Sequence, residues 1–215
     1  MPGIEIPATF DDEPIHVLGY SFDPTSHCIQ EACRIHRLRR HGRNQQILAN
    51  LVAHGMAITI EEVRARSPGA LTYGRPHMAL VMVDKGYVPD VATAFRLYLA
   101  KGKSCYVEGE KWKVPEAIDV IHEARGLAVL AHPQLIRKGL SIDTLLAFKF
   151  DGIEAYYGSL GPLRHRAWCE IAKSRALFIT GGSDFHGAVV PHEPFGRSWA
   201  PEETVDLLLH HFLSL

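Results

Sequence analysis

The sequence predicts an α/β fold that is interrupted by a helical insertion. Three observations support this prediction. Strand-like segments stand at 3–6 and 14–20, the stretch 26–104 carries only helical patterns, and short apolar runs then alternate with amphipathic stretches. Such alternation is typical of parallel strands joined by right-handed crossovers. We therefore expect a discontinuous sheet domain, residues 1–25 and 105–215, and a helical insertion domain, residues 26–104.

The first 25 residues are strand material. Two short apolar segments, 3–6 and 14–20, are separated by the acidic sequence Asp11-Asp12-Glu13. Acidic residues between two apolar runs are typical of a turn. We expect these two strands to belong to the sheet domain.

The insertion contains four predicted helices. In the longest, apolar side chains at positions 47, 48, 51 and 52 form a stripe at helical spacing. Thr59 and Glu62 form a capping-box pattern at the start of the second, and Asp90 is a suitable cap for the fourth. The four helices are expected at about 29–54, 59–67, 76–85 and 91–99.

Strands and helices alternate in the remainder of the chain. Pro115 stands at the first position of a helix that ends at Gly126, and Ser141 caps another. Acidic residues after Pro201 suit the amino-terminal turn of the last helix, because the helix dipole favours negative charge there. In order, the expected elements are a helix at 115–125, a strand at 127–131, a helix at 141–147, a strand at 152–156, a helix at 162–174, a strand at 176–180 and a final helix from 201.

The composition excludes several classes of protein. A length of 215 residues allows one sizeable core, or a core with a small added domain. The net charge of −1 argues against a generally basic nucleic-acid binder. Four cysteines without a C-x-x-C pair indicate reduced thiols and a cytoplasmic protein. No apolar run is long enough for a membrane span, the amino end lacks the pattern of a signal peptide, and no stable protein partner is inferred.

Residues of metal-ligand type follow two of the expected strands. Asp184 and His186 come after the strand at 176–180, and His132 closes the strand at 127–131. Carboxylate and imidazole groups are ligands that Zn²⁺, Mn²⁺ and Fe²⁺ accept. Because α/β folds place their chemistry at the carboxyl ends of strands, the pattern indicates a metallohydrolase. Any one of these histidines alone is more often an ordinary surface or core residue.

Four short motifs, in this order, resemble the PHP (polymerase and histidinol phosphatase) family of metallohydrolases. They are Pro2-Gly3-Ile4-Glu5-Ile6, Ile15-His16-Val17-Leu18-Gly19, Val129-Leu130-Ala131-His132-Pro133 and Gly182-Ser183-Asp184-Phe185-His186. The resemblance covers essentially the whole chain and is strongest to the branch of 3′,5′-nucleoside bisphosphate phosphatases and a 5′-to-3′ exoribonuclease. It implies a distorted (β/α)7 barrel with up to three metal ions at the carboxyl ends of its strands.

The resemblance also implies roles for five residues. Glu5 would bridge the first two metals, His16 and His132 would complete the second site, Asp184 would belong to the first site and His186 to the third. The cofactors would be divalent ions, with Mn²⁺ favoured over Fe²⁺ or Zn²⁺. A metal-bound hydroxide would then attack phosphorus in a nucleoside 3′,5′-bisphosphate or at the 5′ end of a short RNA.

The sequence departs from the family pattern at its amino end. In the family, His-x-His and Thr-Asp-His elements precede the Pro-Gly-x-Glu motif, which here begins at residue 2. We therefore expect an incomplete barrel that is missing its first strands, with only the second metal site intact. A misassigned start, an alternative start, a decayed copy and a chain that needs another polypeptide are all compatible with this. Two other functions stay open: a non-catalytic remnant with one metal site, and an amidohydrolase-like enzyme that cleaves C–N bonds.

Basic residues in the insertion suggest a place for the substrate. The resemblance implies that Arg75 and His77, in the sequence Gly74-Arg75-Pro76-His77, grip a substrate phosphate. An arginine beside a helix amino terminus suits an anion, although an exposed arginine on a capped helix is the simpler alternative. The arginines at 34, 37, 39, 40 and 43 form either a solvated helix face or a path for a polyanion.

Three further residues lie on the strand at 152–156 or just after it. Glu154 either supports a metal ligand or is an ordinary strand-end carboxylate. Tyr156 and Tyr157 either line the substrate pocket or are common aromatic residues at its rim. The sequence leaves these alternatives open.

Overall fold

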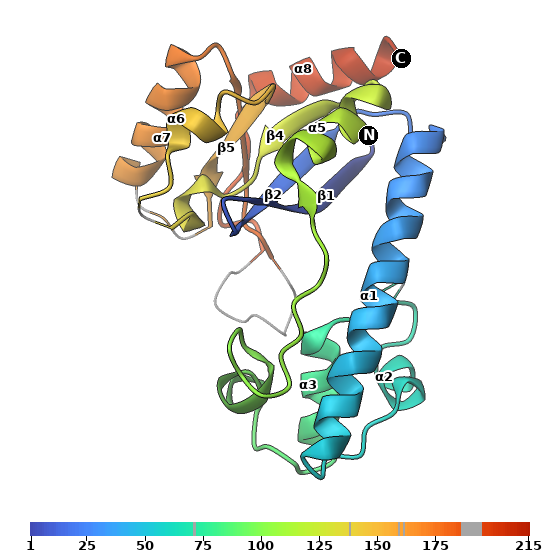
Figure 1. Ribbon diagram of the computed structural model, residues 1–215. Coiled ribbons are helices and arrows are strands. Elements are labelled where there is room, and N and C mark those ends of the chain that lie inside the picture. The colour runs from blue at the N-terminus through green and yellow to red at the C-terminus, as the bar shows by residue number, and fades with distance from the viewer. Residues whose placement is uncertain (71, 138, 159, 161, 186–194) are drawn as a thin grey trace. The chain divides into compact units, whose positions relative to one another are not determined.

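The computed structural model describes residues 1–70, 72–137, 139–158, 160, 162–185 and 195–215 (Figure 1). The chain divides into two compact units. Unit 1 consists of Met1–Ala32 and Lys111–Leu215, and unit 2 consists of Cys33–Glu110. That these units are separate domains with limits at 25/26 and 104/105 stays a prediction.

Unit 1 is built on a sheet whose six described strands run in the order β3-β1-β2-β4-β5-β6. The β1–β2 and β2–β4 pairs are antiparallel, whereas β4, β5 and β6 are parallel to one another, as β1 is to β3. The predicted α/β class is therefore confirmed. The strands are β1 (Gly3–Phe10), β2 (Glu13–Tyr20), β3 (Trp112–Lys113), β4 (Leu127–Leu130), β5 (Gly152–Tyr157) and β6 (Phe178–Gly182).

A tight turn joins the first two strands. Phe10 pairs with Glu13, which leaves only Asp11 and Asp12 in the loop. Both have positive φ, 48° and 60°, as the two central residues of a type I′ hairpin turn require. The turn fixes the register of β1 against β2, and this register positions two side chains of the site described below.

The helices of unit 1 bury the apolar side of the sheet. Ile118 and Ile121 of α5 are at most 2% exposed and belong to one core cluster with Ile15, Val17 and Leu130 of the strands. Removal of this apolar surface from water is the main stabilising term for the unit. The helices are α5 (Val114–Glu123), α6 (Ile142–Leu145), α7 (Pro162–Ser174) and α8 (Glu202–Leu213), with a short 3-10 helix, η2 (Pro133–Leu135).

Unit 2 is helical and has its own apolar core, which includes Ile47, Leu51, Met78 and Met82. The capping box predicted for α2 is present, because Thr59 Oγ1 accepts a hydrogen bond from the backbone N–H of Glu62 and the Glu62 carboxylate accepts one from that of Thr59. The helices are α1 (His27–Ala53), which begins in unit 1, then α2 (Ile60–Arg66), α3 (Arg75–Asp84), α4 (Val91–Ala94) and a π-helical turn, η1 (Phe95–Leu99).

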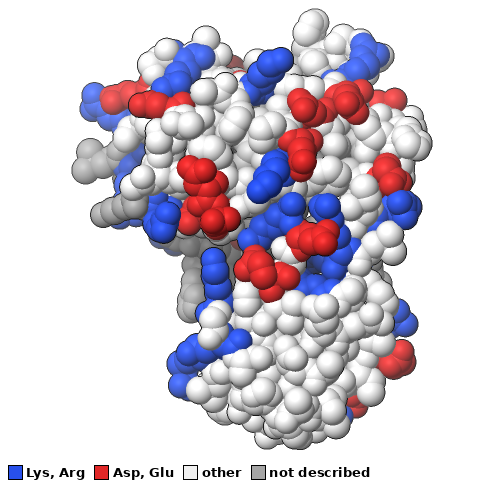
Figure 2. All heavy atoms as spheres, in the orientation of Figure 1, with Lys and Arg blue, Asp and Glu red and all other residues white. Residues whose placement is uncertain are grey.

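The surface carries both signs of charge. Figure 2 shows one face of the molecule, on which acidic and basic side chains are interspersed and a broad area carries neither. This agrees with the net charge of −1. Among the described residues, no helix combines the length and the apolar character needed to cross a membrane.

Candidate metal centre

The hairpin of β1 and β2 brings Glu5 and His16 together. Glu5 is opposite Leu18, and His16 is opposite Pro7, so Glu5 and His16 are diagonal neighbours on one face of the sheet. Glu5 Oε1 lies 2.5 Å from His16 Nδ1. Both side chains are partly exposed, 39% for Glu5 and 38% for His16, so the pair is open to solvent and to ligands.

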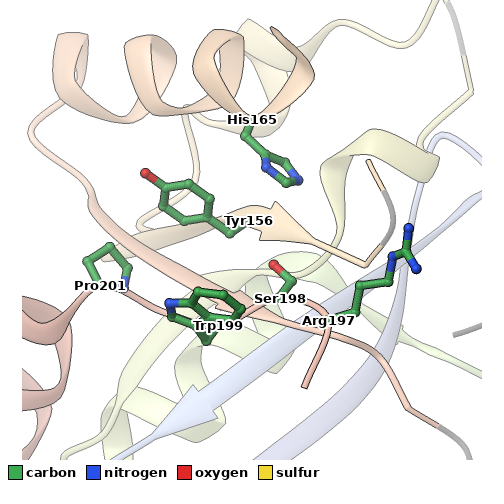
Figure 3. A pocket seen from close by; sticks show the side chains of 6 residues that line it. All are labelled: Tyr156, His165, Arg197, Ser198, Trp199 and Pro201. Carbon is green, nitrogen blue, oxygen red and sulfur yellow. The ribbon is translucent and has the colours of Figure 1, made fainter. Parts of the chain in front are cut away.

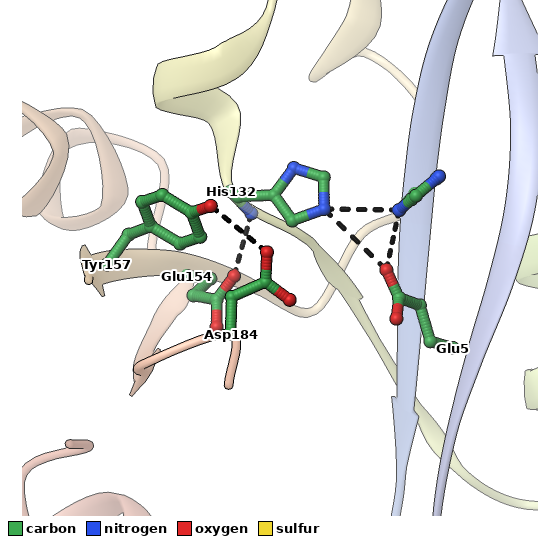
Figure 4. A network of polar contacts seen from close by, with 6 residues as sticks. Glu5, His132, Glu154, Tyr157 and Asp184 are labelled. Atoms are coloured by element: carbon green, nitrogen blue, oxygen red, sulfur yellow. Dashed lines mark hydrogen bonds and ion pairs between the residues drawn. The ribbon is translucent and has the colours of Figure 1, made fainter. Parts of the chain in front are cut away.

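His132 joins this pair from the end of β4. The backbone N–H of Ala131 donates to the carbonyl oxygen of His16, which places the next residue beside the pair. His132 Nε2 lies 3.1 Å from His16 Nδ1 and 3.6 Å from Glu5 Oε1 (Figure 4). Two atoms that bind one divalent ion at about 2.0–2.2 Å are themselves roughly 3–3.5 Å apart. The two distances from His132 Nε2 are close to this range, whereas the 2.5 Å between Glu5 Oε1 and His16 Nδ1 is that of a hydrogen bond and would widen around a cation. The three residues could therefore hold a single divalent cation.

The backbone is unusual at two predicted ligands. His132 and Asp184, which follow β4 and β6, both have positive φ, 26° and 52°. This region costs a residue with a side chain on the order of 1 kcal/mol, and such strain gathers at functional sites. The conformation turns each side chain out of the regular strand alternation as the chain leaves the sheet.

The charges of the three residues depend on one another. The ion pair with His132 and the hydrogen bond with His16 hold the pKa of Glu5 far below its usual value, although burial acts in the opposite direction. Burial lowers the pKa of His132, but the ion pair with Glu5 and the nearby carboxylates of Glu154 and Asp184 outweigh this and raise the pKa. The carboxylates thus favour a positive charge on His132.

A second group of residues holds the first in place. The backbone N–H of His132 donates to Glu154 Oε2 at 2.8 Å, and burial raises the pKa of this carboxyl to about 7. Gln134 Nε2 donates to the backbone oxygens of Glu154 and Ala155. Of the two alternatives for Glu154, these contacts favour support of a candidate ligand over a plain strand-end carboxylate.

Asp184 lies beside the three-residue cluster and is oriented by a tyrosine. Tyr157 Oη donates to Asp184 Oδ2 at 3.0 Å, and the Tyr157 and His132 ring centroids are 5.7 Å apart (Figure 4). The structure therefore brings Glu5, His16 and His132 within 4.8 Å of one another, with Asp184 close by. His186 lies outside the described residues, and the metal roles of all five residues stay predictions.

The predicted phosphate-binding residues lie in unit 2. Arg75 Nη1 donates to the carbonyl oxygen of Leu99, and its guanidinium group is 4.9 Å from the Tyr106 ring centroid. His77 Nδ1 accepts a hydrogen bond from the backbone N–H of Gly74, and burial lowers its pKa. A neutral imidazole that accepts at Nδ1 carries its proton on Nε2, which can then donate to an anion.

Sequence reasoning missed some of the residues around the site. The contact of Gln134 with β5 had no signal in the sequence, because a glutamine just after a strand is common. A pocket of about 350 Å³ is lined by Tyr156, His165, Arg197, Ser198, Trp199 and Pro201 (Figure 3), and only Tyr156 was a candidate. A tryptophan and an arginine close together before the last helix were the available signal.

Comparison with known proteins shows which proteins this chain resembles. No family model matches the chain. It is 33% identical over 210 residues to the 5′-3′ exoribonuclease Rnm of Escherichia coli, covering 94% of this chain and 70% of the relative. It is 30% identical over 189 residues to the 3′,5′-nucleoside bisphosphate phosphatase of Chromobacterium violaceum, covering 86% of this chain and 66% of the relative.

Two solved structures share the fold. A protein described as a metal-dependent phosphoesterase from Bifidobacterium adolescentis has a TM-score of 0.85 and 27% identity, over 97% of this chain and 75% of that one. An amidohydrolase from Chromobacterium violaceum, with bound sulfate and no metal, has a TM-score of 0.79 and 28% identity, over 97% of this chain and 76% of that one.

The fold and the cluster of acids and imidazoles define a metal-dependent phosphoesterase, and the chain belongs to the PHP family. Within that family, the relatives given above are an exoribonuclease and a nucleoside bisphosphate phosphatase, the branch that the four motifs predicted. The family and fold predictions are confirmed. The family implies a divalent metal cofactor, and Glu5, His16 and His132 fit one.

Proposed function

We propose that this protein hydrolyses phosphate esters of nucleoside 3′,5′-bisphosphates or of the 5′ ends of short RNAs. The observation that supports this most directly is the convergence of Glu5 Oε1, His16 Nδ1 and His132 Nε2 within 4.8 Å. The names of its relatives supply the class of substrate. The four cysteines are free thiols, which supports a cytoplasmic location.

Each residue of the candidate metal centre has a proposed role, either in binding the metal or in positioning a ligand. A divalent ion held by Glu5, His16 and His132 would polarise a phosphoryl oxygen and lower the pKa of water. Glu154 holds the backbone of His132, and Tyr157 holds the carboxylate of Asp184. Mixed carboxylate and imidazole ligands suit Mn²⁺, Fe²⁺ and Zn²⁺, and we propose Mn²⁺.

Arg75 and His77 are the proposed phosphate-binding residues. The contact with Leu99 and the stacking on Tyr106 hold the Arg75 guanidinium group in one place. A guanidinium presents a planar fork of donors to phosphate, and its stacking on an aromatic ring reduces the entropy lost on binding. His77 would add a neutral donor from the same turn of α3.

A metal-dependent activity assay tests the proposal. The chain is stripped with a chelator, reloaded with Mn²⁺, Fe²⁺ or Zn²⁺, and incubated with adenosine 3′,5′-bisphosphate and with a 5′-phosphorylated oligoribonucleotide. We expect release of phosphate or of mononucleotides only after reloading. Glu5→Gln should abolish it, whereas the control His210→Ala, at an exposed position on α8, should not.

The same assay separates the other functions. Hydrolysis of cyclic amides instead of phosphate esters would favour an amidohydrolase-like enzyme. Binding of one ion per chain without turnover of either substrate would favour a non-catalytic protein. Either result would overturn the proposed phosphoesterase activity.

A further inference from the structure

A pocket in unit 1 has the composition of a site for a flat, aromatic ligand. Its volume is about 350 Å³, and none of the six lining residues that the structure describes is acidic. Tyr156 comes from β5, His165 from α7, and Arg197, Ser198, Trp199 and Pro201 from the segment that leads into α8 (Figure 3). We call it the aromatic pocket.

The wall formed by residues 197–201 is held against the sheet by a close approach to β6. A Cβ atom on Gly181 would lie 2.6 Å from both the Trp199 carbonyl oxygen and Tyr156 Cβ. Only glycine therefore lets the segment and β5 approach here. At the start of α8, Thr204 Oγ1 donates to the carbonyl oxygen of Ile179 and fixes the other end of the segment. The backbone on both sides of the pocket is thus tied to the sheet.

The rings of the pocket are arranged for stacking. The Tyr156 and His165 centroids are 5.4 Å apart with an interplanar angle of 67°, which orients the tyrosine. Trp199 is 73% exposed, although a tryptophan gains much from burial. In Figure 3 the Tyr156 ring lies between the His165 and Trp199 side chains, and Arg197 stands at one end. An exposed tryptophan beside a tyrosine, with an arginine nearby, is suited to an aromatic ligand that carries a negative group.

The pocket adjoins the candidate metal centre along the chain. Tyr156 lines the pocket, and its neighbour Tyr157 donates to Asp184. A β-bulge in the pairing of β5 with β6 falls between Glu154 and Tyr156, so the regular alternation of side chains is interrupted here. One end of β5 therefore supplies residues to both sites.

We propose, on the basis of the function proposed above, that the aromatic pocket binds the nucleobase of the substrate by stacking on Trp199 and Tyr156. The ligand is then a nucleotide or an RNA end, and a sugar phosphate without a base binds less tightly. Stacking accepts any base, because every base has a π face. The pocket thus sets the class of substrate without reading its sequence.

Binding measurements without metal test this proposal independently of activity. Calorimetry gives the affinities for adenosine 5′-monophosphate and for ribose 5-phosphate in the presence of a chelator. We expect Trp199→Ala to weaken binding of the nucleotide about 5- to 100-fold and to leave that of ribose 5-phosphate unchanged. Trp199→Phe should restore most of the loss. Phe195→Ala, at an 82% exposed aromatic position that does not line the pocket, is the matched control.

The possible results separate the two proposals. Equal loss of affinity for both compounds, or no loss for the nucleotide, overturns the base-binding role of the pocket and leaves the phosphoesterase activity standing. A wild-type protein that hydrolyses no phosphate ester, yet binds the nucleotide through Trp199, overturns the proposed function and leaves base binding intact. Circular dichroism spectra should show that each variant is folded like the wild type.

Discussion

The two units of the chain differ in the ionisable groups that they bring together. In unit 1, carboxylates and imidazoles converge, and Glu5, His16 and His132 favour a positive charge between them. In unit 2, guanidinium groups gather, and burial together with Arg40 and Arg75 lowers the pKa of Arg43. The first arrangement suits a cation and the second suits an anion.

Unit 2 contains a pocket that is lined by several arginines. This pocket of about 260 Å³ is lined by three arginines and, among the residues that the structure describes, by no acidic one. Arg40 Nε donates to His36 Nε2, and Arg64 Nη1 lies 4.0 Å from Glu61 Oε1. Arginines that lie close together raise the local positive potential, which attracts anionic ligands. The pocket is lined by Arg37, Leu38, Arg40, His41, Asn44, Ile60, Arg64, Thr72 and Tyr73.

The largest effect is expected from loss of a candidate metal ligand in unit 1. His16→Ala removes one of three donor atoms, and we expect kcat/KM for adenosine 3′,5′-bisphosphate to fall about 10³-fold or more. Bound metal, measured by mass spectrometry after gel filtration, should fall in parallel. His210→Ala, at an exposed position on α8, is the control for histidine removal. Unchanged metal content in His16→Ala would contradict the assignment.

A core substitution in unit 2 tests whether the two units are independent. Leu51 is fully buried in the core of unit 2, and Leu51→Ala should lower the free energy of unfolding by about 2–5 kcal/mol. If the units are independent, hydrogen exchange should accelerate in residues 33–110 and not in the strands of unit 1. Leu130→Ala, in the core of unit 1, should give the opposite pattern. Acceleration throughout the chain in both variants would show a single cooperative unit.

A smaller effect is expected from the arginines of unit 2. Arg40→Gln should weaken binding of a short RNA about 10-fold at low salt and make the affinity less dependent on salt concentration. Arg66→Gln, which breaks an exposed pair with Asp84, is the control with the same change of charge. Filter binding at several salt concentrations measures both. Equal losses for the two variants would indicate a general charge effect and not a site.

The smallest effect is a pH dependence of stability in unit 2. Burial, with the charges of Arg40, Arg43 and Arg39, lowers the pKa of His36 to about 4, below its usual 6.5. The unfolded chain therefore binds more protons than the folded chain between these values. The free energy of unfolding should fall as the pH falls from 6.5 toward 4, by less than about 2 kcal/mol because His36 is only half buried. Urea titrations of wild type and His36→Gln check this, and an equal loss in both would contradict it.

Most elements of the fold could be predicted from local sequence signals. Thr59 and Glu62 predicted the start of α2, and the acidic turn at 11–13 marked the hairpin of β1 and β2. The strand β3 was missed because two residues are too few to show alternation. The stretch 91–99 was predicted as one helix, and the structure divides it into α4 and a π-helical turn, a difference in hydrogen bonding that side-chain spacing does not reveal.

The candidate site was predictable only in part. The strand-end positions of His132 and Asp184 were visible, because apolar runs precede both. The contact of Glu5 with His16 depends on the register of β1 against β2, which the turn at Asp11 and Asp12 fixes. The aromatic pocket depends on the approach of Trp199 to Gly181 across distant parts of the chain, and such tertiary contacts leave no local pattern.

The left-handed backbone at His132 and Asp184 has a consequence for any attempt to evolve this site in the laboratory. A library that varies either position tests two properties at once, because the replacement must supply the proposed donor atom and also tolerate positive φ. Asparagine tolerates this conformation, whereas valine and isoleucine do not. Selection for a new metal preference at these positions will therefore draw on a narrower set of amino acids than at His16, which lies in an ordinary strand.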